Sequence, residues 1–130
     1  MTRRIASGTR WEPVVGYSRA VAAGDYVFVS GCTSVADGVL VGEGDARAQT
    51  TQAIANVAHA LEQLGLGLAD VVRTRMYVTD ISRWEEYGLA HGTAFGETMP
   101  ATSMIGIAAL VDPRMLIEVE AVAYKPGAGA

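Results

Sequence analysis

The chain has 130 residues, and 50% of them are hydrophobic. A chain of this length and composition can bury a core as one domain, which excludes a disordered protein. Its 10 basic and 14 acidic residues give a net charge of −4, and this acidic balance argues against nucleic acid as a partner.

The first half of the chain predicts a β-hairpin followed by one amphipathic helix. Ser18 to Ala22 and Tyr26 to Ser30 are predicted to be the strands, with Gly24-Asp25 as the turn between them. The helix spans Asp45 to Leu64, with Asp45 available as N-cap and Gly65 just after the end. Its inner face follows helical spacing and consists of Thr50, Ala53, Ile54, Val57, Leu61 and Leu64.

A strand and a second helix come next. The strand, Val71 to Thr79, is predicted from its alternation. It places Val72, Met76 and Val78 on one face and Arg73, Arg75, Tyr77 and Thr79 on the other. The second helix covers Arg83 to Phe95, begins at a capping box formed by Ser82 and Glu85, and ends at Gly96. One of its faces combines Trp84, Tyr87, His91 and Ala94.

Two further strands, Thr102 to Leu110 and Leu116 to Tyr124, are joined through Asp112-Pro113. The last strand places Ile117, Val119, Ala121 and Ala123 on an apolar face and Leu116, Glu118, Glu120, Val122 and Tyr124 on the other. Two helices can cover only one side of the sheet, so the open side stays partly apolar and favours self-association. Residues 1–130 are expected to form a single α+β domain, with Pro126 to Ala130 as a frayed tail.

Metal, cofactor and membrane binding are not indicated. Cys32 is the only cysteine, so no internal disulfide can form, and we interpret it as a packing residue. His59 and His91 lie on different predicted helices, which leaves no metal-ligand spacing. Arg3-Arg4 is not followed by the apolar run of a signal peptide, and no segment is apolar enough to span a bilayer. We expect a cytoplasmic protein without metal or other cofactor.

Short motifs are distributed over nearly the whole chain, from Gly16 to Tyr124. They are Tyr17-Ser18, Ala20-Val21, Gly24-Asp25, Val29-Ser30-Gly31, Asn56-Val57, Leu61 to Gly65, Asp70-Val71-Val72, Pro100-Ala101-Thr102-Ser103 and Ile117-Glu118-Val119-Glu120. Each motif alone is weak. Together they resemble the reactive-intermediate deaminase family, also called the RidA, YjgF-like or endoribonuclease L-PSP family.

The resemblance implies a chorismate-mutase-like α+β fold with a mixed sheet and two helices packed on one face. It also implies a homotrimer in which the sheets form a central barrel and small molecules bind in clefts between subunits. Members of the best-known subgroup hydrolyse enamine and imine intermediates to keto acids and ammonia. By resemblance, Glu118 positions the attacking water, and Tyr17, Ser30 and Gly31 line the cleft.

Two positions depart from the family pattern. Thr102 occupies the position of the arginine that binds the substrate carboxylate, and Met104 that of a frequent cysteine. Replacing the guanidinium by a hydroxyl removes an interaction worth roughly 1.5–3 kcal/mol, about ten- to a hundredfold in binding. The resemblance therefore implies an altered substrate specificity.

The charged residues of the open face have alternative interpretations. Glu118 either positions water or is a face residue paired with Arg73 or Arg75. Either arginine could supply the charge missing at Thr102, or both could pair with Glu118 and Glu120 inside the barrel. Glu120 itself is interpreted as structural.

Three functions follow as alternatives. The first is cofactor-free hydrolysis of an imine, an enamine or a related metabolite in an intersubunit cleft. The second is a trimer that binds a metabolite without catalysis. The third is a ribonuclease or translation inhibitor, which the acidic balance disfavours.

Overall fold

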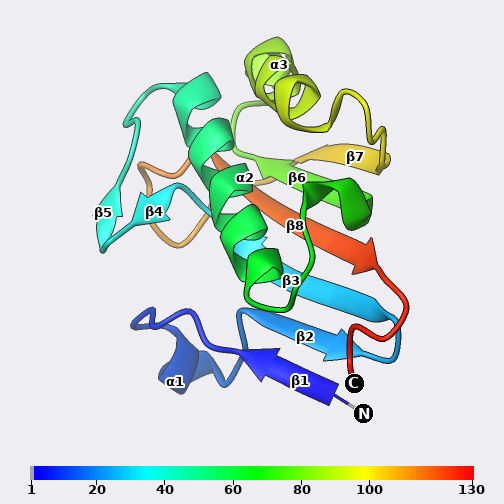
Figure 1. The fold of residues 1–130 in the computed structure, drawn as a ribbon. Helices are drawn as coiled ribbons and strands as arrows, with labels where there is room; N and C mark the ends of the chain where they lie inside the picture. The colour runs from blue at the N-terminus through cyan, green and yellow to red at the C-terminus, as the bar shows by residue number, and fades with distance from the viewer. Residues whose placement is uncertain (1) are drawn as a thin grey trace.

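The computed structural model describes residues 2–130, which are built around a six-stranded sheet (Figure 1). In spatial order the strands are β1 (Thr2–Ile5), β2 (Ala20–Ala23), β3 (Tyr26–Cys32), β8 (Ile117–Tyr124), β6 (Val71–Val78) and β7 (Ala101–Gly106). All neighbouring strands are antiparallel except β6 and β7, which are parallel. The predicted mixed sheet is confirmed.

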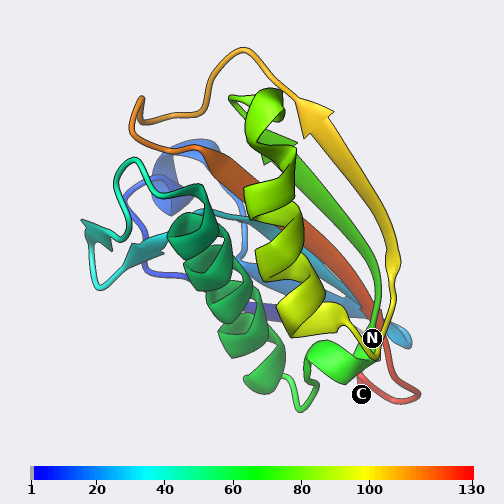
Figure 2. The same ribbon diagram turned by 90° about the horizontal axis from the view of Figure 1, so that it is seen from above.

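Two helices, α2 (Ala46–Glu62) and α3 (Trp84–Phe95), lie side by side on one face of the sheet (Figure 2). Helix α2 begins as predicted, because the Asp45 carboxylate accepts a hydrogen bond from the Ala48 N–H. The capping box predicted for α3 is wrong. Asp80 instead accepts hydrogen bonds from the backbone N–H and the hydroxyl of Ser82, in a 3-10 turn (Ile81–Arg83) that precedes the helix.

Strand β8 lies in the middle of the sheet and its alternation is as predicted. The side chains buried against the helices are Ile117, Val119, Ala121 and Ala123. The buried side chain of Gln49 on α2 holds the approach to this strand. Its amide nitrogen donates to the carbonyls of Gly42 and Arg114, and its oxygen accepts from the Leu116 N–H. These contacts fix the chain just before Glu118.

Strand β6 differs from the prediction at its first residues. A register shift against β8 between Val71 and Arg73 turns Val72 outward, so that Val72 is 45% exposed and Val71 is buried. Beyond the shift, Thr74 completes the buried face with Met76 and Val78. Strand β7 is also shorter than predicted, since it ends at Gly106 and not at Leu110.

Several short elements were not predicted. They are strand β1, one turn of helix α1 (Glu12–Val15), the hairpin of β4 (Val35–Ala36) and β5 (Val39–Leu40), and a 3-10 turn at Leu68–Asp70. Segments of two to four residues are too short to show a hydrophobic period.

The C-terminal tail packs against the sheet, so the prediction of a frayed tail is wrong. Ala128 is only 5% exposed, and its carbonyl accepts a hydrogen bond from the Arg3 guanidinium. The Gly129 N–H donates to the Gly24 carbonyl, and the Gly127 N–H donates to the Asp25 carboxylate. The tail is therefore tied to β1 and to the turn between β2 and β3, partners that lie far away in sequence.

The open face of the sheet is partly apolar, as expected from the alternation of β8. Tyr26, Phe28 and Tyr124 are exposed and form one aromatic cluster, with ring centroids 6.5 Å apart for Tyr26 and Phe28 and 5.1 Å apart for Tyr26 and Tyr124. Tyr77 lies on the same face and donates a hydrogen bond to Glu120 at 2.8 Å.

Candidate active site

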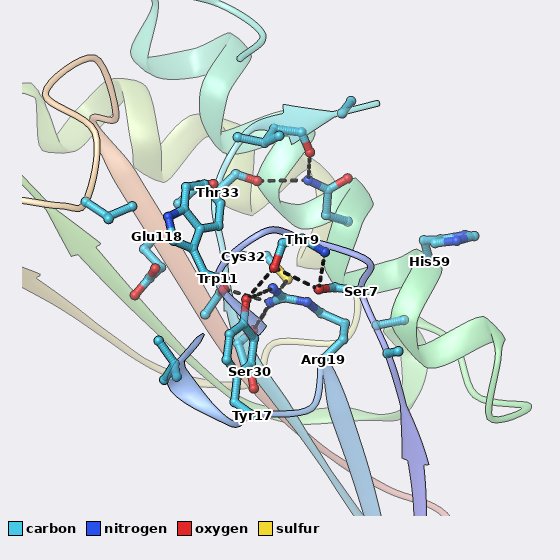
Figure 3. Close-up of a pocket in the computed structure, with 18 of the residues that line it drawn as sticks. Ser7, Thr9, Trp11, Tyr17, Arg19, Ser30, Cys32, Thr33, His59 and Glu118 are labelled. Carbon is cyan, nitrogen blue, oxygen red and sulfur yellow. Dashed lines mark hydrogen bonds between the residues drawn. The ribbon is translucent and has the colours of Figure 1, made fainter. Parts of the chain in front are cut away.

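A cavity of about 720 Å³ lies beside the end of β3 and the start of β8 (Figure 3). Its wall is formed by the N-terminal segment between β1 and β2, the loop after β3, helix α2 and strand β8. Four residues predicted for the site line it, namely Tyr17, Ser30, Gly31 and Glu118. The volume is within the usual range for small-molecule sites.

Glu118 lies directly against Gly31. A Cβ atom at position 31 would be 2.5 Å from Glu118 Cδ and 2.6 Å from its Oε2. The pairing of β3 with β8 shifts register between Val29 and Cys32, and this irregularity includes Gly31. Any larger residue at position 31 would therefore displace the Glu118 carboxyl group.

The electrostatic surroundings of Glu118 raise the pKa of its carboxyl group. Partial burial raises the pKa of this carboxyl above its ordinary 4.5, and the charge of Glu120 raises it further, whereas Arg19 lowers it. Among residues 2–130, no salt bridge engages the Glu118 carboxylate. Because its pKa is raised, this carboxyl group accepts a proton more readily than an ordinary surface carboxylate does.

Arg19 is a cavity residue that sequence reasoning missed. Its Nη1 donates to the carbonyls of Ser30 at 3.1 Å and Gly31 at 2.7 Å and contacts the sulfur of Cys32 at 3.3 Å. Its Cζ lies 5.6 Å from the ring centroid of Tyr17. One sequence feature could have pointed to Arg19. It directly precedes a strand rich in alanine and valine, and a charged group next to an apolar strand needs hydrogen-bond partners.

Polar contacts hold the two cavity walls that lie outside regular secondary structure. The Asn56 amide on α2 donates to the carbonyls of Thr33 and Val35 and so fixes the loop after β3. In the N-terminal segment, the hydroxyls of Thr9 and Tyr17 are 2.8 Å apart. These contacts orient Tyr17 and the loop toward the same space as Glu118 (Figure 3).

Thr102 and Met104 lie outside this cavity, on the edge strand β7. The Thr102 hydroxyl is 2.8 Å from the hydroxyl of Thr74, which is 2.8 Å from His91 Nε2. Thr74 is fully buried. Thr102, at the position of the family arginine, thus begins a hydrogen-bonded row of Thr102, Thr74 and His91 that reaches helix α3 within one chain.

This row predicts a pH-dependent stability. Burial lowers the pKa of His91 below 6.5, so the unfolded chain binds the proton more readily than the folded chain. We expect the free energy of unfolding to decrease as pH falls below about 6.5 and to level off below the folded pKa. Urea denaturation between pH 7.5 and pH 5, about the range in which histidine titrates, measures this slope.

The His91→Gln variant removes the titrating group and should flatten the profile. The control is His59→Gln, because His59 is exposed on α2. Identical profiles for wild type and His91→Gln would contradict the assignment.

Arg73 and Arg75 also lie outside the cavity, on β6. Arg73 Nη2 donates to the Ser103 hydroxyl at 3.0 Å, and Arg75 Nη1 is 3.9 Å from Glu120 Oε1. Glu120 is thus engaged by Arg75 and Tyr77 on the open face, whereas Glu118 faces the cavity.

Within residues 2–130, no three side chains of histidine, cysteine, aspartate or glutamate gather as ligands for a metal ion. In the same part of the chain, no helix combines the length and hydropathy needed to cross a membrane.

Known proteins resemble this chain over nearly its whole length. Residues 7–125 match the family described as endoribonuclease L-PSP. An uncharacterized protein of Streptomyces coelicolor is 38% identical over 123 residues, which are 95% of this chain and 92% of that protein. The 2-iminobutanoate/2-iminopropanoate deaminase of Salmonella typhimurium is 29% identical, over 96% of this chain and 99% of the enzyme.

A solved structure is also similar to this chain over nearly its whole length. The crystal structure of Rv2704 from Mycobacterium tuberculosis, a member of the YjgF/YER057c/UK114 family, has a TM-score of 0.87 and 48% identity. The match covers 96% of this chain and 100% of that one. The chain therefore belongs to the endoribonuclease L-PSP (YjgF/RidA) family, some of whose members are imine deaminases. The predicted family and fold are confirmed.

Proposed function

We propose that this protein hydrolyses the imine or enamine form of a small metabolite in the cavity around Glu118. The observation that carries this proposal is the half-buried Glu118 carboxyl, which is packed on Gly31 and faces a space large enough for a small molecule. The similarity to an enzyme named as a 2-iminobutanoate/2-iminopropanoate deaminase supports the same class of reaction.

The reaction needs no redox partner. The Glu118 carboxylate accepts a proton from a water molecule as the water oxygen attacks the imine carbon. Glu118 returns that proton to the nitrogen, which gives the neutral carbinolamine. It then carries the hydroxyl proton of the carbinolamine to the same nitrogen, so that the C–N bond breaks and ammonia leaves as the C=O bond forms. One imine and one water give one ketone and one ammonia, and the raised pKa of Glu118 suits these proton transfers.

We also propose that the protein works as a homotrimer. The exposed aromatic cluster of Tyr26, Phe28 and Tyr124 leaves an apolar surface on the open face that another copy could cover. In this arrangement, Thr102 and Met104 on β7 would approach the cavity of a neighbouring subunit. Light scattering should give three times the chain mass of 13.6 kDa, and a stable monomer would contradict the assembly.

The test of the reaction is imine hydrolysis by the Glu118→Gln variant. Imines generated in the assay by an amino-acid dehydratase should release keto acid faster with wild type than without it. Glu118→Gln should lower the enzymatic rate by about 10²- to 10⁴-fold, since it removes the proton acceptor. Glu120→Gln is the matched control, because Glu120 lies on the same strand but contacts Tyr77 and Arg75. Equal losses in both variants, or no loss in Glu118→Gln, would contradict the proposed role.

A trimer that binds a metabolite without catalysis is the second candidate. The hydroxyl of Thr102 at the position of the family arginine favours it, because Thr102 is hydrogen-bonded to Thr74 and the Pro100 carbonyl. Saturable ligand binding by a wild type that releases no keto acid would support this candidate. Activity gained by Thr102→Arg would instead show that the cleft is intact and takes a different substrate.

The ribonuclease alternative has the weakest support, because the net charge of −4 opposes binding to RNA. Cleavage of RNA by highly purified protein that persists in Glu118→Gln would revive it.

A further inference from the structure

Arg19 is the only arginine or lysine among the described residues that line the cavity. The other ionisable groups in the wall include Glu118, the exposed Asp37 and the exposed His59. A ligand with a negative charge therefore has one permanent cation to bind within this cavity.

The guanidinium of Arg19 is held in place on one side. Its Nη1 donates hydrogen bonds to the carbonyls of Ser30 and Gly31, and its Nη2 donates a long one of 3.4 Å to the Tyr17 hydroxyl. The Tyr17 ring packs against it as well. A guanidinium fixed in this way loses little conformational freedom when it binds a ligand.

A second edge of the same guanidinium is available. The Nε–H and one N–H of Nη2 have no hydrogen-bond acceptor among residues 2–130. These two parallel donors form a fork that fits both oxygens of a carboxylate. Arg19 also forms none of the salt bridges found among these residues.

Arg19 and Glu118 meet at Gly31. Arg19 Nη1 donates to the Gly31 carbonyl at 2.7 Å, and the Glu118 carboxyl packs where a Cβ of residue 31 would lie. The cation and the carboxyl group therefore both lie next to Gly31 and line the same cavity. A 2-imino acid has its carboxylate next to the imine carbon. It can therefore place the carboxylate at Arg19 and the imine carbon at Glu118.

From this geometry we infer that Arg19 binds the carboxylate of the substrate, in place of a cation at position 102, and selects small 2-imino monocarboxylates. This inference rests on the proposed function for the identity of the reacting group. It assigns a substrate-binding residue to the same subunit that supplies Glu118.

The experiment measures binding separately from hydrolysis. The probes are 2-oxobutanoate, a stable keto acid, and 2-butanone, which has the same chain length but no charge. NMR titrations that follow the backbone amides near Gly31 give both dissociation constants. Arg19→Gln should weaken 2-oxobutanoate binding about ten- to a hundredfold and leave 2-butanone binding unchanged. Arg19→Lys keeps the charge but loses the two parallel donors. Its affinity for 2-oxobutanoate should lie between those of wild type and Arg19→Gln.

The control variant is Arg47→Gln, which makes the same charge change on the exposed face of α2. It should bind both probes as wild type does. Unchanged 2-oxobutanoate affinity in Arg19→Gln, equal loss of both probes, or no binding by wild type would each overturn the inference. Equal loss would mean that Arg19 only supports the Ser30 and Gly31 carbonyls.

The two proposals can fail separately. Charge-selective binding that depends on Arg19, found together with no keto-acid release by wild type, would sink the hydrolase proposal and keep this inference. Hydrolysis that depends on Glu118 but not on Arg19 would keep the hydrolase proposal and overturn the inference about Arg19.

Discussion

Replacing Gly31 with alanine is expected to lower kcat/KM for imine hydrolysis by about a hundredfold or more while the protein stays folded. The added methyl would lie 2.5 Å from Glu118 Cδ, so the carboxyl group must move. A side chain can move at low cost to stability, but a displacement of about 1 Å at a reacting group can cost about 10²-fold in rate. Keto-acid release and urea denaturation of the same preparation measure the two effects.

The matched control for this change is Gly67→Ala. Gly67 has an extended backbone, with φ of −141°, and a Cβ there would meet no atom within 4 Å. This variant should keep wild-type activity and stability. Full activity in Gly31→Ala would show that the position of Glu118 against Gly31 is not needed for the reaction.

Replacing Gln49 with leucine is expected to lower the free energy of unfolding by about 2–5 kcal/mol. Gln49 is fully buried, and its side chain makes three hydrogen bonds with backbone groups of Gly42, Arg114 and Leu116. Leucine fills a similar volume but makes none of these hydrogen bonds. The Gly42 carbonyl keeps the Asp45 N–H as a donor, whereas the Arg114 carbonyl and the Leu116 N–H lose their partner. A buried unpaired group costs about 1–3 kcal/mol. The midpoint of urea denaturation measures the loss.

Gln63→Leu serves as the control for Gln49, since Gln63 is exposed at the end of α2. Its effect should stay within about 0.5 kcal/mol. A loss below about 1 kcal/mol in Gln49→Leu would mean that the approach to β8 is held by other contacts.

The parts of the fold that depend on local periodicity were predictable. The inner face of α2 and the buried face of β8 follow from spacings of about 3.6 and 2 residues, and both are buried as predicted. The predicted face of Val72 was wrong because a bulge against β8 depends on two strands that are far apart in sequence. The packed tail was missed for the same reason, since its partners are Arg3, Gly24 and Asp25.

The candidate site was only partly predictable. The resemblance led to Tyr17, Ser30, Gly31 and Glu118, which the fold brings to one cavity. It gave no reason to select Arg19, because its contacts with the Ser30 and Gly31 carbonyls arise from the register of β2 and β3. No sequence period encodes such a contact.

The two edge strands of the sheet differ in charge. Strand β1 presents exposed Arg3 and Arg4 at one edge, and charged side chains on an edge strand discourage pairing with another sheet. Strand β7 forms the other edge and has no charged residue from Ala101 to Gly106. We therefore expect any edge-to-edge pairing of copies to use β7, and the charge of β1 to discourage open-ended polymerisation.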